Sequence, residues 1–116
     1  MTILEHYFYL SDLAVNDKIS LQKLCCLFKD DAIIEANDGH SYSGREEIDS
    51  FFTEFFSRNV ETRHLYDIQK LSDTVQQANW GVVCRRKNGA YIALTGTDIA
   101  EIEDGKISHL SITSNN

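Results

Sequence analysis

The sequence of 116 residues contains no proline, only six glycines and a single tryptophan. It also has no low-complexity tract, internal repeat or change of composition that would mark a linker between domains. With 42% hydrophobic residues, a chain of this length buries roughly 65% of its unfolded surface around one core. We therefore expect a single domain that spans residues 1–116.

Basic residues are scarce, since 11 Lys and Arg stand against 18 Asp and Glu, which gives a net charge of -7. A phosphate backbone or an anionic membrane surface repels such a chain unless a local basic patch intervenes. The basic cluster from Arg85 to Lys87 lies beside a turn signal and is typical of a solvated hairpin end. The sequence thus predicts a protein that binds neither nucleic acid nor membranes.

Long hydrophobic runs and cysteine pairs are also missing. No stretch approaches the roughly 20 apolar residues of a membrane span, and the start lacks the basic region and cleavage site of a secretory signal. Cys25 and Cys26 are adjacent and Cys84 is distant, which is neither a disulfide framework nor a zinc motif, and the histidines show no metal-ligand spacing. We expect a cytoplasmic protein with no metal and no other cofactor.

The first half of the chain has the periodicity of amphipathic helices. Thr2 and Glu5 have the spacing of a capping box, and an apolar helical face follows over residues 3–14. Ser20 is placed to cap a second, shorter helix over residues 20–28.

A third helix follows Ser43, which repeats the capping-box spacing with Glu46. Behind this start, apolar residues recur at i, i+3, i+4, i+7 and i+8, the pattern of one buried helix face. These residues are Ile48, Phe51, Phe52, Phe55 and Phe56.

Strand signals occupy the remainder of the chain. Ala32 to Ala36 is short and β-branched, residues 37–44 have the composition of a loop, and period-two alternation begins at Thr62. With Asn88-Gly89 and Asp104-Gly105 as hairpin turns, the later strands are expected over 62–71, 74–86, 91–103 and 106–113. Because strands this long must twist and coil, the predicted fold class is α+β, with three N-terminal helices packed in a curved, mixed or antiparallel sheet around a pocket.

The order of these elements, with the strings LFKDDAIIE, YSGREEIDSFF, ETRHLYD and DGKISHLSI, resembles the nuclear transport factor 2-like superfamily and within it the SnoaL-like group. The resemblance covers nearly the whole chain. It implies a cone-shaped α+β roll, often a homodimer through the outer sheet face, with a pocket between sheet and helices. Members include ketosteroid isomerases, polyketide cyclases, scytalone-type dehydratases and epoxide hydrolases, besides proteins that only bind or only associate, so the fold leaves the function open.

Two acids are compared with the carboxyl groups of the ketosteroid isomerases. Ala36 occupies the position of the isomerase base, and Asp38, two residues on, either reaches inward or forms a turn beside Gly39. Asp98 matches the acid that donates a hydrogen bond to the developing oxyanion. It shares strand parity with apolar residues, where desolvation would raise its pKa, and the alternative for it is a salt bridge to Arg85 or Lys106.

Two further residues are candidates through the same resemblance. The tyrosine that completes the oxyanion site falls near Tyr9 or, in a shorter alignment, near Asp12, and the alternative for Tyr9 is a core residue. His64 matches a histidine that points into the cavity of some relatives as a general acid or base, and its ordinary pKa suits that role. We take His64, Asp98 and Tyr9 as candidate catalytic residues.

The expected walls of the pocket come from the apolar faces of the third helix and of the strands. The residues predicted to line it are Ile34, Phe52, Phe55, Tyr66, Trp80, Val82 and Leu94. The first hypothesis is a cofactor-free isomerase, dehydratase or cyclase that moves a proton on a hydrophobic carbonyl or hydroxyl compound. The second is a non-catalytic module that binds a small hydrophobic molecule or forms a homodimer, which the missing base at Ala36 favours.

Overall fold

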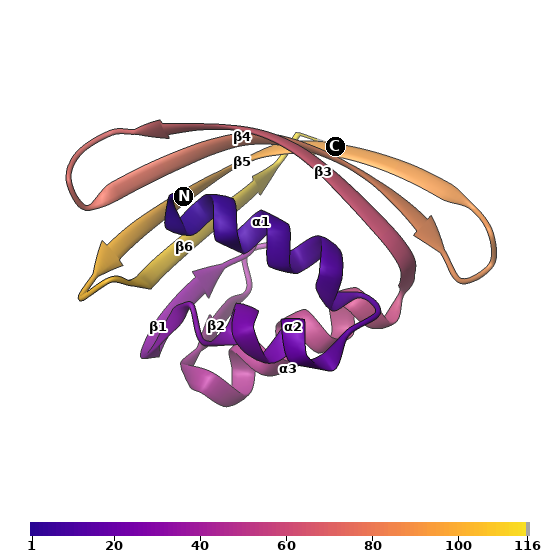
Figure 1. The fold of residues 1–116 in the computed structure, drawn as a ribbon, viewed down its shortest axis with the longest axis horizontal. Coiled ribbons are helices and arrows are strands. Elements are labelled where there is room, and N and C mark those ends of the chain that lie inside the picture. Colours follow the sequence, from indigo (N-terminus) through magenta and orange to yellow (C-terminus); the bar gives the residue numbers. More distant parts are fainter. Residues whose placement is uncertain (116) are drawn as a thin grey trace.

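The computed structural model describes residues 1–115, and its strands form one mixed sheet. They are β1 (Phe28–Glu35), β2 (Ser41–Ser43), β3 (Asn59–Lys70), β4 (Val75–Arg86), β5 (Tyr91–Glu103) and β6 (Lys106–Ser114). Their order is β2-β1-β6-β5-β4-β3, in which β1 and β6 are parallel and the other neighbours are antiparallel. The predicted α+β class is confirmed, with a sheet that arches over the helices without closing (Figure 1).

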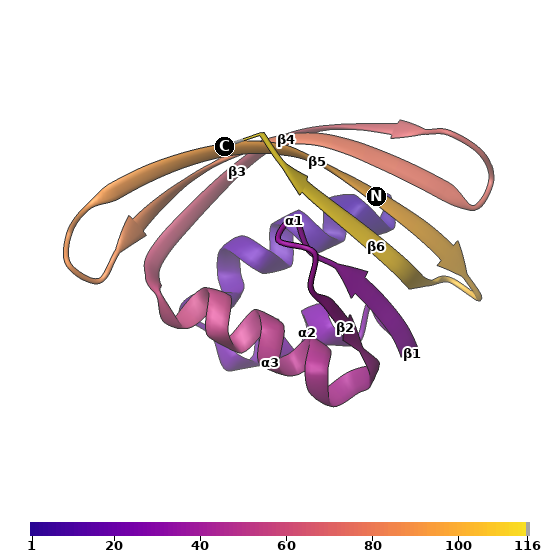
Figure 2. The same cartoon turned by 180° about the vertical axis from the view of Figure 1, so that it is seen from behind.

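Three helices fill the hollow of this sheet. They are α1 (Ile3–Ala14), α2 (Lys18–Cys25) and α3 (Gly44–Ser57). Helix α1 lies against the concave face, whereas α2 and α3 lie farther from it (Figures 1 and 2). The predicted capping box is confirmed, because Thr2 Oγ1 accepts from the Glu5 N–H at 3.2 Å and Glu5 Oε1 accepts from the Thr2 N–H at 3.1 Å.

The predicted limits of the second helix and of the first strand were wrong. Asp17, not Ser20, caps α2, and the helix ends at Cys25. Strand β1 therefore starts at Phe28, four residues before Ala32, because pairing with β6 outweighs the polar sequence there. The charged side chains of Lys29, Asp30 and Asp31, which are unusual in a strand, are partly or fully exposed on β1.

The predicted loop over residues 37–44 contains the short strand β2, which pairs with β1 through Ile33, Ile34 and Glu35. The capping box predicted next to it is absent. The Ser43 side chain makes no cap hydrogen bond, and its N–H donates instead to Glu47 Oε1 at 2.9 Å. A carboxylate one residue later than expected thus stabilises the start of α3.

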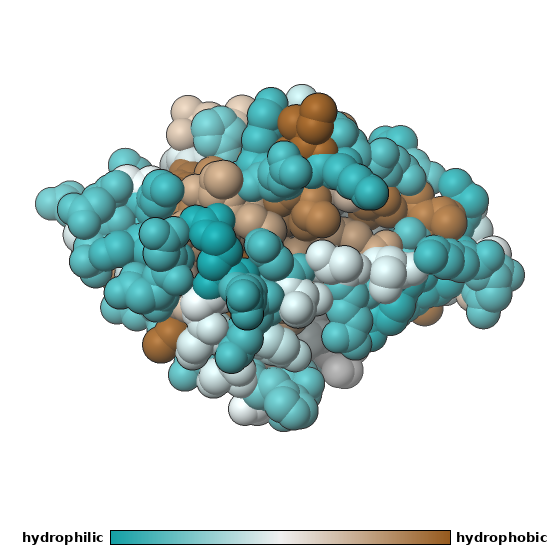
Figure 3. All heavy atoms as spheres, turned by 90° about the horizontal axis from the view of Figure 1, so that it is seen from below, coloured by the Kyte–Doolittle hydropathy of each residue, from teal (hydrophilic) through white to brown (hydrophobic). Residues whose placement is uncertain are grey.

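The long strands were predicted within a few residues, and the limits of β5 agree with the prediction. Both predicted turns are present. Asp104 and Gly105 have φ of 54° and 77°, the left-handed conformation that a tight hairpin turn requires. Seen from below, apolar side chains gather across the middle of the molecule, and polar residues cover the two ends of its long axis (Figure 3).

The core lies between α1, α3 and the concave face of the sheet. Fully buried side chains come from every layer, and the largest of them include Leu4, Phe8, Leu24, Phe28, Ile34, Ile48, Ile107 and Leu110. Within residues 1–115, no helix has the length and apolar character needed to cross a membrane.

Candidate functional site

A cavity of about 110 Å³ lies inside the roll, between α1, α3 and the concave face of the sheet. Helices α1 and α3 contribute the aromatic residues Tyr7, Phe8, Phe51, Phe52, Phe55 and Phe56. The strands add Trp80, Val82, Leu94 and Ile112. The remaining polar lining residues are Ser11, His64 and Asp98, so a few polar groups converge on an apolar space, as in small-molecule sites.

Asp98 stands on the concave face of β5 and is 2% exposed. Trp80 Nε1 donates to Asp98 Oδ1 at 2.8 Å. Burial raises the pKa of this carboxyl to about 7, because desolvation outweighs the opposing effect of the indole hydrogen bond. The alternative of a salt bridge is wrong, since Arg85 pairs with Glu61 instead.

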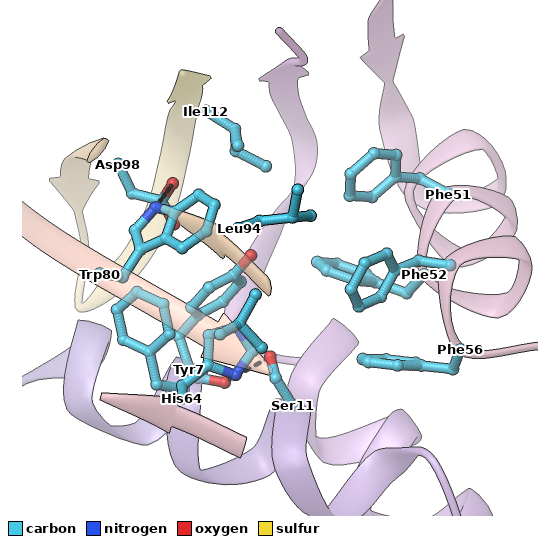
Figure 4. A pocket seen from close by; sticks show the side chains of 13 residues that line it. Tyr7, Ser11, Phe51, Phe52, Phe56, His64, Trp80, Leu94, Asp98 and Ile112 are labelled. Carbon is cyan, nitrogen blue, oxygen red and sulfur yellow. Dashed lines mark hydrogen bonds between the residues drawn. The ribbon is translucent and has the colours of Figure 1, made fainter. Parts of the chain in front are cut away.

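Trp80 reaches Asp98 because the strand residue opposite it is a glycine. Trp80 on β4 pairs with Gly96 on β5, two residues before Asp98. A Cβ at Gly96 would lie 2.4 Å from Trp80 Cζ2 and 2.2 Å from the Thr113 carbonyl oxygen. Gly96 therefore leaves the space that the indole occupies, and Figure 4 shows this ring beside Asp98.

His64 lines the same pocket from β3 and is held by Asp12 of α1. Its Nδ1 lies 2.6 Å from Asp12 Oδ1. Asp12 Oδ2 accepts from the His64 backbone N–H at 3.0 Å, and Asp12 Oδ1 accepts from Thr62 Oγ1 at 3.1 Å. A carboxylate at Nδ1 favours the proton on that nitrogen, so Nε2 of the neutral ring is the proton acceptor.

The same histidine also borders the outside of the molecule. A second, more open cleft is lined by His64 together with Tyr9, Asp12, Tyr66 and Arg85. The ring of His64 thus separates this outer cleft from the inner pocket, while its edge packs against Phe8 at a centroid distance of 5.2 Å.

Tyr9, the third candidate, lies outside the inner pocket. It is 56% exposed and lines the outer cleft. Its neighbour Tyr7 is buried and lines the inner pocket instead, because the buried stripe of α1 runs through Leu4, Tyr7, Phe8 and Ser11. That i, i+3, i+4, i+7 spacing in the sequence would have identified Tyr7. Burial and the nearby Asp98 raise the pKa of Tyr7.

Of the residues predicted as pocket walls, Phe52, Phe55, Trp80, Val82 and Leu94 line the cavity. Ile34 and Tyr66 do not, which corrects those two predictions. Ile34 is fully buried in the core without reaching the cavity. Tyr66 stacks on Phe8 at 4.8 Å but faces the outer cleft, because β3 is the last strand of the sheet at that side.

The acidic residue near the isomerase base position forms a turn. Asp38 Oδ1 accepts from the His40 N–H at 3.0 Å, and its carboxylate also lies 3.0 Å from His40 Nδ1. The hydrogen bond to the His40 N–H holds the pKa of Asp38 below its usual value, and Asp38 is absent from the pocket lining. Among the residues described, no three His, Cys, Asp or Glu side chains are grouped to hold a metal ion.

Comparison with known proteins identifies the family. The family model of the SnoaL-like domain matches residues 12–110, and the chain belongs to this family. Among solved structures, an NTF2-like protein of unknown function from Exiguobacterium sp. 255-15 is 26% identical over 99% of both chains, with a TM-score of 0.88. A search of curated proteins found no match.

Two enzymes have the same fold at lower identity. An epoxide hydrolase/cyclase-like enzyme of pyran ring formation in the polyether salinomycin is 15% identical over 97% of this chain and 88% of its own, with a TM-score of 0.83. A type 2 hexachlorocyclohexane dehydrochlorinase is 18% identical over 97% and 83%, with a TM-score of 0.71. These likenesses support the fold, whereas the activity of this chain must be argued from its own site.

Proposed function

We propose that this protein is a cofactor-free acid/base enzyme that moves a proton on a small hydrophobic carbonyl or hydroxyl compound. The observation that supports it is the presence of His64 and Asp98 on the walls of one small apolar cavity. The His64 ring is oriented by the Asp12 carboxylate, and Asp98 is a buried acid with a raised pKa. Such pairs of titratable groups with different environments are typical of proton-transfer sites.

In the proposed reaction, His64 Nε2 removes a proton from the carbon next to the substrate carbonyl, and the C–H electron pair forms an enolate. Negative charge then develops on the carbonyl oxygen. Protonated Asp98 donates a hydrogen bond to that oxygen, while Asp98 Oδ1 keeps its bond from Trp80. The proton on Nε2 then either returns to another carbon, which completes an isomerisation, or is replaced by a hydrogen from solvent that is delivered to the original carbon, which completes an exchange. Neither course needs a co-reactant other than water.

The test measures exchange of α-protons for deuterium in cyclohexanone by proton NMR in D₂O. Exchange needs only formation of the enolate, replacement of the proton on Nε2 by solvent deuterium and return of that deuteron to the same carbon. We expect His64→Gln to reduce the enzymatic rate by about 10²–10⁴-fold, since glutamine can still bond Asp12 but cannot take up a proton. The rate of the unaltered protein should fall as the pH rises through about 7, where Asp98 loses its proton.

His109→Gln is the matched control, because His109 also lies beside carboxylates, Glu35 and Glu101, but does not line the pocket. It should leave the rate unchanged. Equal rates in the His64→Gln variant and the unaltered protein would exclude the catalytic proposal and leave a protein that only binds its ligand.

A homodimer is proposed as well, from the convex face of the sheet. Leu65, Val83 and Tyr91 are 84%, 49% and 70% exposed, and an uncovered apolar group of this kind is typical of an interface. We expect the chain to elute as a dimer in gel filtration with light scattering, and Leu65→Glu to shift it toward the monomer. A monomer at high concentration would contradict this. Cytoplasmic location and independence of cofactors remain predictions of the sequence.

A further inference from the structure

The size of the inner cavity restricts what the site can hold. Its volume of about 110 Å³ lies below the roughly 300–1,000 Å³ of pockets that enclose drug-sized ligands. It is instead close to the cavity of about 150 Å³ that admits a single benzene ring in another protein. A fused-ring compound therefore exceeds the space between the sheet and α3.

The aromatic side chains of the cavity wall pack against one another, so none of them can move without losing contacts with its neighbours. The Phe52 ring packs against Phe28 at 5.7 Å, Tyr7 at 6.1 Å and Phe56 at 6.1 Å. Phe51 packs edge-on against Phe52 at 5.1 Å. Enlarging the cavity would require several of these contacts to be lost together, which costs packing energy.

Trp80 and Asp98 lie apart from the phenylalanines of α3, and Figure 4 draws Ser11 and Tyr7 between these two sides. Figure 4 shows Phe51, Phe52 and Phe56 on one side of the pocket, and Trp80 with Asp98 on the other. An occupant with one polar end can place that end near Asp98 and His64 while the remainder lies against the rings. A polar group placed directly against the rings of Phe51, Phe52 and Phe56 would lack a hydrogen-bond partner, because phenylalanine offers none.

We infer that the substrate is a compound with one six-membered ring, or a short chain of similar size, that carries a carbonyl or hydroxyl group at one end and is apolar at the other. Fused-ring compounds such as steroids and polycyclic polyketides are excluded by the size of the cavity. The nature of the polar group rests on the proposed function, whereas the size limit rests on the cavity alone.

Binding of cyclohexanone and of the two-ring ketone 2-decalone tests the size limit. Trp80 is the only tryptophan and lines the cavity, so its fluorescence reports occupancy. We expect cyclohexanone to bind at least about tenfold more tightly than 2-decalone, because a group that does not fit costs at least this factor. Equal or tighter binding of 2-decalone, or no saturable binding of cyclohexanone, would overturn the inference.

A variant with a larger cavity distinguishes size from chemistry. Phe55 is half-buried and lines the pocket, so Phe55→Ala should enlarge the cavity and bring 2-decalone within about threefold of cyclohexanone. Phe51→Ala is the second choice if the first variant does not fold. Ile19→Ala removes an exposed apolar side chain outside the cavity and should leave the preference unchanged.

The outcomes separate this inference from the proposed function. Selective binding of cyclohexanone without any α-proton exchange would support the size limit and contradict the proposed enzymatic activity. If α-protons of 2-decalone exchange as fast as those of cyclohexanone, and if His64→Gln abolishes this exchange, the proposed enzymatic activity is supported and the size limit is contradicted.

Discussion

The Gly96→Ala variant is expected to lose about 3 kcal/mol of unfolding free energy, the upper part of the range for an overpacked site. A Cβ here would lie 2.2 Å from the Thr113 carbonyl oxygen, which is backbone on the neighbouring strand and cannot rotate away. The same Cβ would meet the Trp80 ring at 2.4 Å and push it from Asp98. Urea denaturation measures the loss, and a change in Trp80 fluorescence should accompany it.

Gly81→Ala provides the matched control, since Gly81 lies on β4 and also pairs within the sheet. A Cβ there would meet Thr95 Cγ2 at 3.8 Å and the Leu94 carbonyl oxygen at 3.9 Å, which are ordinary contacts. Its stability should be unchanged or slightly higher, because alanine restricts the unfolded chain. Equal stability of the two variants would show that the indole does not need the space at Gly96.

The second large effect concerns pH. Asp98→Asn should become more stable than the unaltered protein as the pH rises, by roughly 3–4 kcal/mol at pH 8 relative to pH 4. Asparagine has nearly the same shape, and its Oδ1 can still accept from Trp80 Nε1. The variant therefore removes the charge while keeping the hydrogen bond.

The sign of this effect follows from the raised pKa of Asp98, about 7 in the fold against 3.8 in the unfolded chain. Below pH 4 the carboxyl is protonated in both the folded and the unfolded state, so it does not lower the free energy of unfolding. Between pH 4 and 7 the unfolded chain loses this proton first, so the native protein loses stability until the effect is complete above pH 7. Urea denaturation of both proteins at several pH values measures it, and a constant difference across this range would contradict the raised pKa.

The sequence was most informative where local patterns are repeated. Alternation along residues 91–103 gave the limits of β5 and placed Asp98 among inward-facing residues. The capping box gave the start of the first helix, and the period of 3.6 gave the first and third helices. The spacing of Phe52 and Phe55 placed them on the wall of a pocket. These features depend on neighbours in the chain, so they can be read without knowing how the elements meet.

The errors arose where a local signal was weak or misleading. Lys29, Asp30 and Asp31 do not look like a strand, yet β1 includes them. The reason is that β1 pairs with the parallel strand β6 on both sides of this stretch, at Phe28 and again from Ile33. Tyr9 was chosen by alignment to a family position, although the stripe of α1 turns Tyr7 inward. In both cases tertiary packing overrode an inference based on a short segment.

Local patterns in the sequence were sufficient for the three helices and the four long strands, because these depend on periodicity, and the order of the motifs indicated the family. Three features could be seen only in the folded chain: Asp12 contacts His64, 52 residues away in the sequence, Trp80 lies over Gly96 and bonds Asp98, and the cavity is small. Such features arise from the distances between packed elements. Those distances are set by how side chains from distant segments fill one interior, which no local pattern records.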